Sequence, residues 1–194
     1  MMTSMDSRVA IRRRLNGHGS FVILLTGLSG AGKTTLGSAL EEHLLSCGMR
    51  AILLDGDRIR LGLSAGLGFS AEDRGENLRR SAEAARLLVD SGSIVIAAFI
   101  APFREDRQRF RERFAPDEFA EVHLNCSFEA CRLRDAKGLY QRAGAGSIGE
   151  FTGFSSPYEA PLSPELVLAT EAEPPPDCLR RLQDLVWEMD QRQE

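Results

Sequence analysis

The sequence lacks the long apolar stretches that are typical of membrane proteins. No run approaches the roughly 18 apolar residues of a membrane-spanning helix, and the first 20 residues contain no apolar core of a secretory signal. We therefore expect no membrane association and a cytoplasmic protein. Arginines in residues 1–20 resemble those of transit peptides, but Asp6 and the absence of a long amphipathic stretch favour a solvated N-terminal arm.

Metal-ligand cysteine patterns and a basic charge are also missing. The four cysteines form no CxxC pair, so we expect reduced, mostly buried thiols at Cys47, Cys126, Cys131 and Cys178. The formal net charge of −4 argues against a general nucleic-acid-binding role. The segment FREDRQRFRERF is basic in places, but its alternating charges favour a solvated, salt-bridged helix face over a nucleic-acid site.

Short apolar runs alternate with helical patterns along the chain. This alternation predicts an α/β fold with a mainly parallel sheet, and a length of 194 residues fits one domain, which we expect over residues 21–194. Strands are predicted at residues 21–26, 51–54, 93–99, 120–124 and 165–168. Longer helices are predicted from Lys33, over about 73–90, over 103–114, and after the prolines at 174–176.

Residues 137–157 are rich in glycine and polar side chains and show no clear periodicity. Long segments of this kind in compact domains commonly cover binding sites. We expect this segment to form a mobile flap that contributes nothing to the hydrophobic core.

A glycine-rich loop follows the first predicted strand. The sequence GLSGAGKT, from Gly27 to Thr34, matches G-x-x-x-x-G-K-[ST] without a mismatch. Its glycines let successive N–H groups point at phosphates, while Lys33 supplies charge to the β- and γ-phosphates and Thr34 offers a hydroxyl to Mg²⁺. The alternative is a glycine-rich turn with an accidental lysine, which the strand–loop–helix context disfavours. The predicted nucleotide contacts are Gly27, Leu28, Ser29, Gly30, Ala31, Gly32, Lys33, Thr34 and Thr35.

The loop by itself leaves a GTPase, an ATPase motor and a small-molecule kinase open. A guanine-specificity motif of the N-K-x-D type is absent, and the strand SIVIAAF ends without the acidic residue that motors use to hold the metal. The chain is also too short for a coupled motor domain. Of the three classes, a kinase that acts on a small acceptor is therefore the one that remains.

Two carboxylates follow the second predicted strand. Asp55 and Asp57 would lie at the carboxyl end of that strand, where ligands bind in such sheets. One carboxylate there can order metal-bound water, and the other can accept a proton from an attacking hydroxyl. The alternative is a turn in which both aspartates only cap backbone N–H groups.

Arginines and one aromatic residue follow these carboxylates. Arginine suits bidentate contact with phosphate or sulfate, so an anionic acceptor is indicated, and the candidates are Arg60, Arg74, Arg79 and Arg80. Phe69 lies between Gly68 and Ser70 in a predicted loop, which makes it a poor core residue. We expect its ring to stack on a base.

Motifs along nearly the whole chain resemble those of the adenylyl-sulfate kinase family. They are LNGH, TGLSGAGKTTL, LDGDRIRLGL, LGFSAEDRGENLRR, FIAPFREDR, RDAKGLY, FTGF, PYEAP and PELVL. The resemblance implies a P-loop kinase with a three-layer α/β/α fold that uses ATP and Mg²⁺. It also implies transfer of the γ-phosphoryl group to the 3′-hydroxyl of adenosine 5′-phosphosulfate (APS), with PAPS and ADP as products. Dimers are common in the family, so a homodimer is a further expectation.

The resemblance also implies roles for individual residues. Asp57 resembles the carboxylate that accepts the hydroxyl proton, and Asp55 resembles the one near the metal. Lys33 completes the implied catalytic set. Residues that match the acceptor contacts are Arg60, Phe69, Arg74, Asn77, Ile100, Ala101, Lys137 and Phe151, the two phenylalanines as a sandwich around adenine. Residues that match contacts to the ATP base are Arg134 and Glu173.

The chain departs from the family pattern at the turn after the third strand and in the flap. Ala101 replaces a common serine, so no phosphoserine can form there, and the flap carries Gln141 and Gly144 where relatives carry lysine and arginine. The altered flap motivates one alternative, a related kinase that acts on another nucleotide or a specialised metabolite. A second alternative is a nucleotide-binding module without turnover, against which the presence of every expected catalytic group argues.

Overall fold

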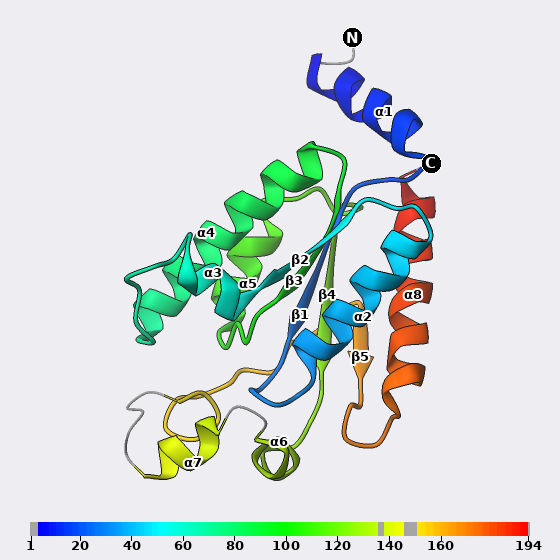
Figure 1. The fold of residues 1–194 in the computed structure, drawn as a ribbon. Coiled ribbons are helices and arrows are strands. Elements are labelled where there is room, and N and C mark those ends of the chain that lie inside the picture. The colour runs from blue at the N-terminus through cyan, green and yellow to red at the C-terminus, as the bar shows by residue number, and fades with distance from the viewer. Residues whose placement is uncertain (1–3, 136–137, 146–150, 194) are drawn as a thin grey trace.

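The computed structural model describes residues 4–135, 138–145 and 151–193, and its centre is one five-stranded sheet (Figure 1). The strands are β1 Val22–Thr26, β2 Ala51–Asp55, β3 Ile94–Ala98, β4 Phe119–Leu124 and β5 Leu166–Leu168. All pairings are parallel, and the spatial order is β2-β3-β1-β4-β5. The predicted α/β class and five strands are confirmed. No predicted strand boundary differs from the observed boundary by more than one residue.

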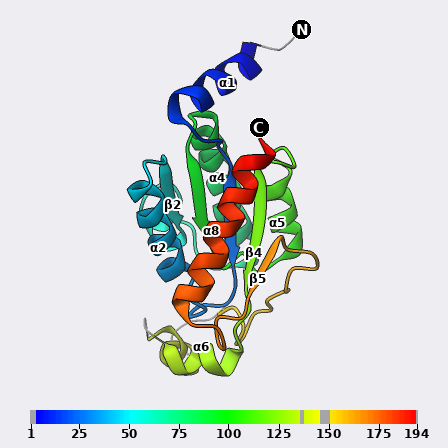
Figure 2. The ribbon, with the colours of Figure 1, turned by 90° about the vertical axis from the view of Figure 1, so that its right-hand side faces the viewer.

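Helices cover both faces of this sheet (Figures 1 and 2). Helices α2 Lys33–Ser46 and α8 Pro175–Arg192 lie on one face, and α4 Ala71–Asp90 and α5 Arg104–Arg111 lie on the other. Each of these helices was predicted. Four shorter or terminal helices were not: α1 Ser4–Asn16, α3 Gly56–Leu61, α6 Phe128–Arg134 and α7 Leu139–Gly144. The three-layer α/β/α architecture is confirmed.

Each face of the sheet has its own hydrophobic cluster. Strands β1 and β3 are fully buried along their length because helices cover them from both sides, as their continuous apolar sequences indicate. Leucines spaced by four residues along α2 pack on one face together with the apolar side of α8. Leu78, Ala82, Ala85 and Val89 of α4 pack on the other face. These four residues are the ones that the periodicity predicts.

The parallel arrangement brings the carboxyl ends of all five strands to one edge. The glycine-rich loop follows β1, Asp55 ends β2, and Ile100 and Ala101 follow β3. Helix α6 follows β4, and Thr170 lies just beyond β5. Residues that are far apart in the sequence therefore meet at one end of the molecule, the lower end in Figure 1.

The expectation that residues 137–157 add nothing to the core is wrong for the residues described there. Tyr140, Ala143 and Phe151 are buried and belong to the cluster that includes α2 and α8. The aromatic rings supply enough apolar surface to anchor this segment against the loop after β1 and α6. Lys137 lies outside the described residues, so its predicted acceptor contact is not described by the structure.

The N-terminal segment is helical over most of the predicted arm. Helix α1 projects from the rest of the molecule (Figure 1), and Ile11 and Leu15 are exposed on it. Arg12 donates to the Asp90 carbonyl, and Asn16 Nδ2 donates to the Gly92 carbonyl at 2.9 Å. These contacts tie α1 to the end of α4. Burial of the chain begins at His18, whose Nε2 accepts from the Arg50 backbone N–H.

The cysteines and the charged helix agree with the sequence-based expectations. All four thiols are free, and only Cys47 is exposed. The charged segment 103–114 forms surface salt bridges, including Arg111 with Glu165 at 2.7 Å and Arg113 with Glu83 at 2.8 Å. Among the described residues, no helix combines the length and the apolar character that crossing a membrane would need.

Candidate active site

A cavity of about 1070 Å³ opens at the carboxyl edge of the sheet. Its volume is at the upper limit for pockets that hold one drug-sized ligand, so it can accommodate two nucleotides. It is lined by most of the predicted site residues: Ser29, Gly30, Ala31, Gly32, Lys33, Thr34, Thr35, Asp55, Asp57, Arg60, Phe69, Arg74, Asn77, Ile100, Ala101, Arg134, Phe151 and Glu173. Gly27 and Leu28 do not line the cavity.

The glycine-rich loop has the backbone geometry that its sequence predicts. Gly27 and Gly30 have φ angles of 150° and 81°. A Cβ atom at Gly27 would lie 2.7 Å from the Leu124 carbonyl oxygen, and one at Gly30 would lie 2.9 Å from that of Cys131. Only glycine fits these close approaches without distortion. Lys33 Nζ donates to the carbonyls of Gly27 and Leu28 at 2.9 and 2.7 Å, so these two carbonyls fix the position of the lysine ammonium group.

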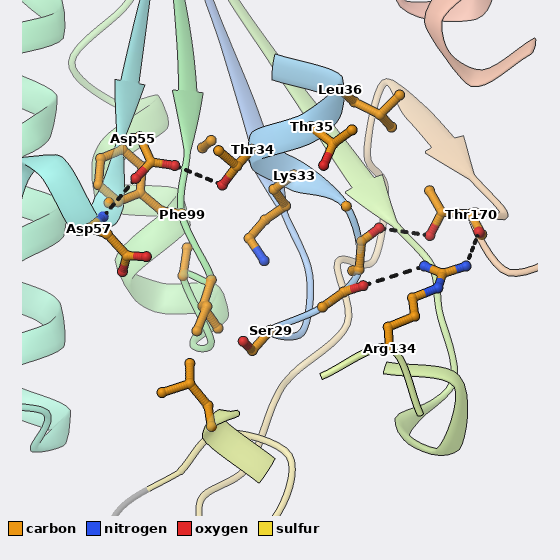
Figure 3. A pocket seen from close by; sticks show the side chains of 18 of the residues that line it. Ser29, Lys33, Thr34, Thr35, Leu36, Asp55, Asp57, Phe99, Arg134 and Thr170 are labelled. Atoms are coloured by element: carbon orange, nitrogen blue, oxygen red, sulfur yellow. Dashed lines mark hydrogen bonds between the residues drawn. The ribbon is translucent and has the colours of Figure 1, made fainter. Parts of the chain in front are cut away.

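Two oxygen-bearing side chains meet where α2 begins. Thr34 Oγ1 donates to Asp55 Oδ2 at 2.8 Å (Figure 3). The other oxygen of Asp55, Oδ1, accepts from the backbone N–H groups of Asp57 and Arg58 and caps α3. Asp55 therefore performs the capping role that the sequence left open and also faces Thr34. Asp57 lies in the first turn of α3, exposed, and its carboxylate lines the cavity.

Phe69 lies at one end of the cavity between two arginines. Its side chain is 55% exposed, which rules out an ordinary core role, and the Arg60 and Arg74 guanidinium carbons lie 4.5 and 5.5 Å from its ring centroid. Arg74 Nε also donates to the Phe69 carbonyl at 2.8 Å. Burial lowers the pKa of Arg60, an effect that the nearby carboxylates of Asp57 and Asp73 oppose. This end of the cavity combines positive charge with an aromatic face.

The amide of Asn77 lies next to this cationic end. Asn77 is buried in α4, and its Oδ1 atom has no hydrogen-bond partner among the described residues. A buried polar group of this kind is suited to bind a ligand. Arg79 and Arg80, which the sequence offered as further acceptor contacts, both pair with Glu76 instead, at 2.7 and 2.8 Å. They do not line the cavity, so that expectation is wrong.

The turn after β3 forms the floor of the cavity near Phe99. Ala101 has a φ angle of 45°, which lies in the left-handed region that favours glycine. Thr26 Oγ1 donates to the Ile100 carbonyl at 2.7 Å, and Arg107 Nη1 donates to the Ala101 carbonyl at 2.6 Å. Both carbonyl oxygens of this turn are therefore bonded within the protein.

The opposite end of the cavity surrounds Arg134 of α6. Its Nη2 atom donates to the Thr170 carbonyl at 2.6 Å, and its Nη1 lies 3.4 Å from the Gly30 carbonyl (Figure 3). Thr170 Oγ1 donates to the Ala31 carbonyl at 2.9 Å. These bonds join the chain after β5 to the glycine-rich loop. Glu173 accepts from Arg181, and this hydrogen bond lowers the pKa of the Glu173 carboxyl group.

Tyr140 and Phe151 close the cavity from the segment predicted as a flap. The Tyr140 hydroxyl donates to the Ser29 carbonyl at 2.9 Å, and burial raises the pKa of that hydroxyl. Phe151 packs edge-on against Tyr140, with ring centroids 4.8 Å apart and an interplanar angle of 87°. Phe151 thus lines the cavity and also belongs to the core. Whether Phe69 and Phe151 enclose one base stays a prediction.

Several lining residues were not among the predicted site residues, including Tyr140, Arg142, Asp106 and Thr170. Tyr140 lies in the motif KGLY, and Asp106 lies in FREDR, so sequence signals existed for both. Thr170 had no such signal, because its contribution depends on how the chain turns after β5. Among the described residues, no group of three or more His, Cys, Asp or Glu side chains is arranged to hold a metal ion.

The sheet order, the glycine-rich loop after β1 and the cavity shared with two aspartates define a P-loop kinase-type protein. The chain belongs to the adenylylsulphate kinase family, whose family model matches residues 19–169.

Curated relatives agree with this family assignment. The adenylyl-sulfate kinase of Geotalea daltonii is 56% identical over 80% of this chain and 76% of its own length. That of Oceanobacillus iheyensis is 52% identical over 84% of this chain and 81% of its own length. Among solved structures, the Mycobacterium tuberculosis APS kinase in complex with AMPPNP and APS is 41% identical with a TM-score of 0.83. The match covers 86% of this chain and 97% of that one.

Proposed function

We propose that the protein is an adenylyl-sulfate kinase, which transfers the γ-phosphoryl group of ATP to the 3′-hydroxyl of APS and releases PAPS and ADP. The observation that carries this proposal is that one cavity contains both the glycine-rich loop and the cationic, aromatic end around Phe69. A structurally similar relative was solved with AMPPNP and APS together. Both substrates are nucleotides, and the cavity is large enough for the pair.

The ATP phosphates would lie along the loop from Gly27 to Thr34. Backbone N–H groups there, and the amino end of α2, favour negative charge. Lys33 would move its ammonium group from the loop carbonyls to the β- and γ-phosphates. The adenine would lie at the end of the cavity near Arg134 and Glu173. In Figure 3, Lys33 lies between Arg134 on one side and Asp57 on the other, which fits transfer along this line.

Thr34 and Asp55 have the right chemistry for Mg²⁺. Magnesium prefers oxygen ligands and is commonly held by one or two protein groups together with substrate phosphates. The Thr34 hydroxyl and the Asp55 carboxylate lie 2.8 Å apart beside Lys33, so these residues fit the ion. When bound, Mg²⁺ would neutralise charge on the transferring phosphoryl group.

The acceptor would bind between Phe69 and the turn at Ile100 and Ala101. Arg60 and Arg74 would bind its anionic group, Asn77 would supply a buried amide, and Phe69 would stack on its adenine. Asp57 would accept the proton of the attacking 3′-hydroxyl. Tyr140 and Phe151, which line the cavity, would help to exclude water from the transfer.

Two broader properties belong to the same proposal. We place the protein in the cytoplasm, because its four free thiols fit a reducing compartment. We also propose that the protein forms a homodimer, because a similar protein assembles: the APS kinase of Thiobacillus denitrificans, 30% identical with a TM-score of 0.65, is hexameric. That match covers 90% of this chain but 30% of that one.

Initial-rate kinetics with varied ATP and APS test the proposed reaction. Because Ala101 has no hydroxyl to carry a phosphoryl group, we expect direct transfer in a ternary complex, and therefore intersecting reciprocal plots. AMP, adenosine and water serve as alternative acceptors and should support far lower rates than APS. Parallel plots with a phosphorylated enzyme isolated without APS would contradict direct transfer. A higher rate with another acceptor than with APS would contradict the assignment of APS as the substrate.

Replacing Phe69 by alanine should weaken APS binding without lowering the melting temperature. The ring is exposed, so little core packing is lost, whereas stacking on a base contributes roughly 1–3 kcal/mol. Phe154→Ala is a matched control, because Phe154 is also 55% exposed but does not line the active-site cavity. Calorimetric titration with APS should show weakened binding for Phe69→Ala alone. A lower melting temperature at unchanged APS affinity would contradict the stacking role.

A further inference from the structure

Arg107 of α5 is a buried cation whose hydrogen bonds all go to other segments. Its side chain is 3% exposed. Nε donates to Glu121 Oε1 at 2.6 Å, Nη1 to the Ala101 carbonyl at 2.6 Å, and Nη2 to the Glu159 carbonyl at 2.7 Å. Burying a charge is costly unless it is paired and its hydrogen bonds are satisfied. Each of these bonds is therefore expected to be important for the local structure.

The three acceptors come from three parts of the chain around the active site. Glu121 lies within β4 and fixes the guanidinium against the sheet. Ala101 lies in the turn that lines the cavity, and Glu159 lies just after the segment predicted as a flap. The planar fork of arginine presents a separate nitrogen atom to each acceptor, whereas the ammonium group of lysine has a single nitrogen. Arg107 thus connects the turn after β3 to the sheet and to the segment around Glu159, which follows Phe151 in the sequence.

The turn itself needs such support. Ala101 has a φ angle of 45°, a left-handed conformation that is unfavourable for a residue with a Cβ atom. A second contact acts on the preceding residue: Thr26 Oγ1 donates to the Ile100 carbonyl and lies 3.0 Å from the Tyr158 hydroxyl. Arg107 lies against the ring of that tyrosine, 5.8 Å from its centroid. These contacts form one connected network beneath the turn.

We propose that Arg107 is a positioning residue for the anionic acceptor. By binding the Ala101 carbonyl, it keeps that oxygen directed into the protein, while Thr26 does the same for Ile100. A carbonyl oxygen that turned into the cavity would place negative partial charge beside the acceptor and repel it. Arg107 does not line the cavity, so it would act on the acceptor only through the turn. This inference rests on the proposed function, because it assumes that the acceptor is an anion such as APS.

Arg107→Lys tests the inference, with Arg86→Lys as the matched control. Lysine keeps the positive charge near Glu121 but cannot bind all three acceptors. Arg86 is a part-buried arginine on the same face of the sheet that bonds two carboxylates, Glu118 at 2.5 Å and Asp90 at 2.6 Å, and it does not line the cavity or contact the turn. Both variants should lose some stability. Only Arg107→Lys should raise the KM for APS, by about 10-fold, with the KM for ATP nearly unchanged.

Amide hydrogen exchange provides a readout that does not depend on the substrate. Arg107→Lys should speed exchange in the peptide that contains residues 99–103, and Arg86→Lys should not. If exchange in residues 99–103 is unchanged in Arg107→Lys, the positioning role is overturned. The same holds if the KM values for APS and ATP change equally in both variants. If the wild-type enzyme does not phosphorylate APS but Arg107→Lys still speeds exchange in residues 99–103, APS is excluded as the substrate. The role of Arg107 in fixing the turn would then be supported.

Discussion

Asp57→Asn should nearly abolish phosphoryl transfer while ATP binding stays close to that of the wild type. Asparagine keeps the size of the side chain but cannot accept the proton of the acceptor hydroxyl, and losing a general base typically costs ~10²–10⁴-fold in rate. ATP binding should survive because the glycine-rich loop, which follows a different strand, is expected to hold the phosphates. The measurement is the single-turnover rate with saturating ATP and APS, together with titration by a non-hydrolysable ATP analogue.

The control for this variant is Asp177→Asn. Asp177 lies at the start of α8, pairs with the exposed Arg180 and does not line the cavity, so its replacement should change neither rate nor affinity. Asp57 is itself exposed, so the protein should stay folded after its replacement. Near-normal turnover of Asp57→Asn would rule out its role as the proton acceptor.

Lys33→Ala should reduce both ATP affinity and the rate of transfer. The ammonium group is expected to contact phosphates in the ground state as well as the transferring group, so both are affected, unlike in Asp57→Asn. A hydrogen bond to a charged group contributes about 1.5–3 kcal/mol, which corresponds to about 10- to 100-fold in affinity. Titration with a non-hydrolysable ATP analogue and steady-state kinetics measure the two losses separately.

Lys33→Met separates the loss of charge from the loss of packing. Lys33 is buried and donates to the carbonyls of Gly27 and Leu28, so alanine removes both its stem and those bonds. Methionine keeps most of the apolar volume and removes only the charge and the donors. Both variants should lose ATP affinity to a similar extent. If Lys33→Met binds ATP like the wild type, the loop does not use its lysine for the phosphates.

The sheet was predictable because its signals are local and strong. Strands β1 and β3 are continuous apolar runs, and the helix after Gly32 follows a complete phosphate-loop motif. The shorter helices α3, α6 and α7 were missed because six or seven residues give too little periodicity to detect. The segment 137–157 was misjudged for a related reason. Its glycines suggested a loose loop, whereas Tyr140 and Phe151, in the described part of the segment, are buried.

The candidate site was predictable where its residues lie in sequence motifs. It was not predictable where tertiary contacts determine which side chains reach the cavity. Asp55 and Thr34 belong to separate motifs, and only the folded sheet brings their side chains within 2.8 Å. Arg79 could not be excluded from the sequence, because the sequence does not show which side of α4 faces the cavity, and in the structure Arg79 pairs with Glu76 on the same helix. Arg107 gave no sign of its role, since it lies in a segment whose other arginines are surface charges.

The position of the transferred phosphoryl group tests the central claim most directly. The protein is incubated with ATP and APS, and the nucleotide product is isolated and examined by phosphorus NMR and mass spectrometry. We predict one additional phosphate, attached to the 3′-oxygen of an intact adenosine 5′-phosphosulfate, and formation of one ADP for each such product. Phosphate on another position or another acceptor, or ADP formed only with free phosphate, would contradict the assignment.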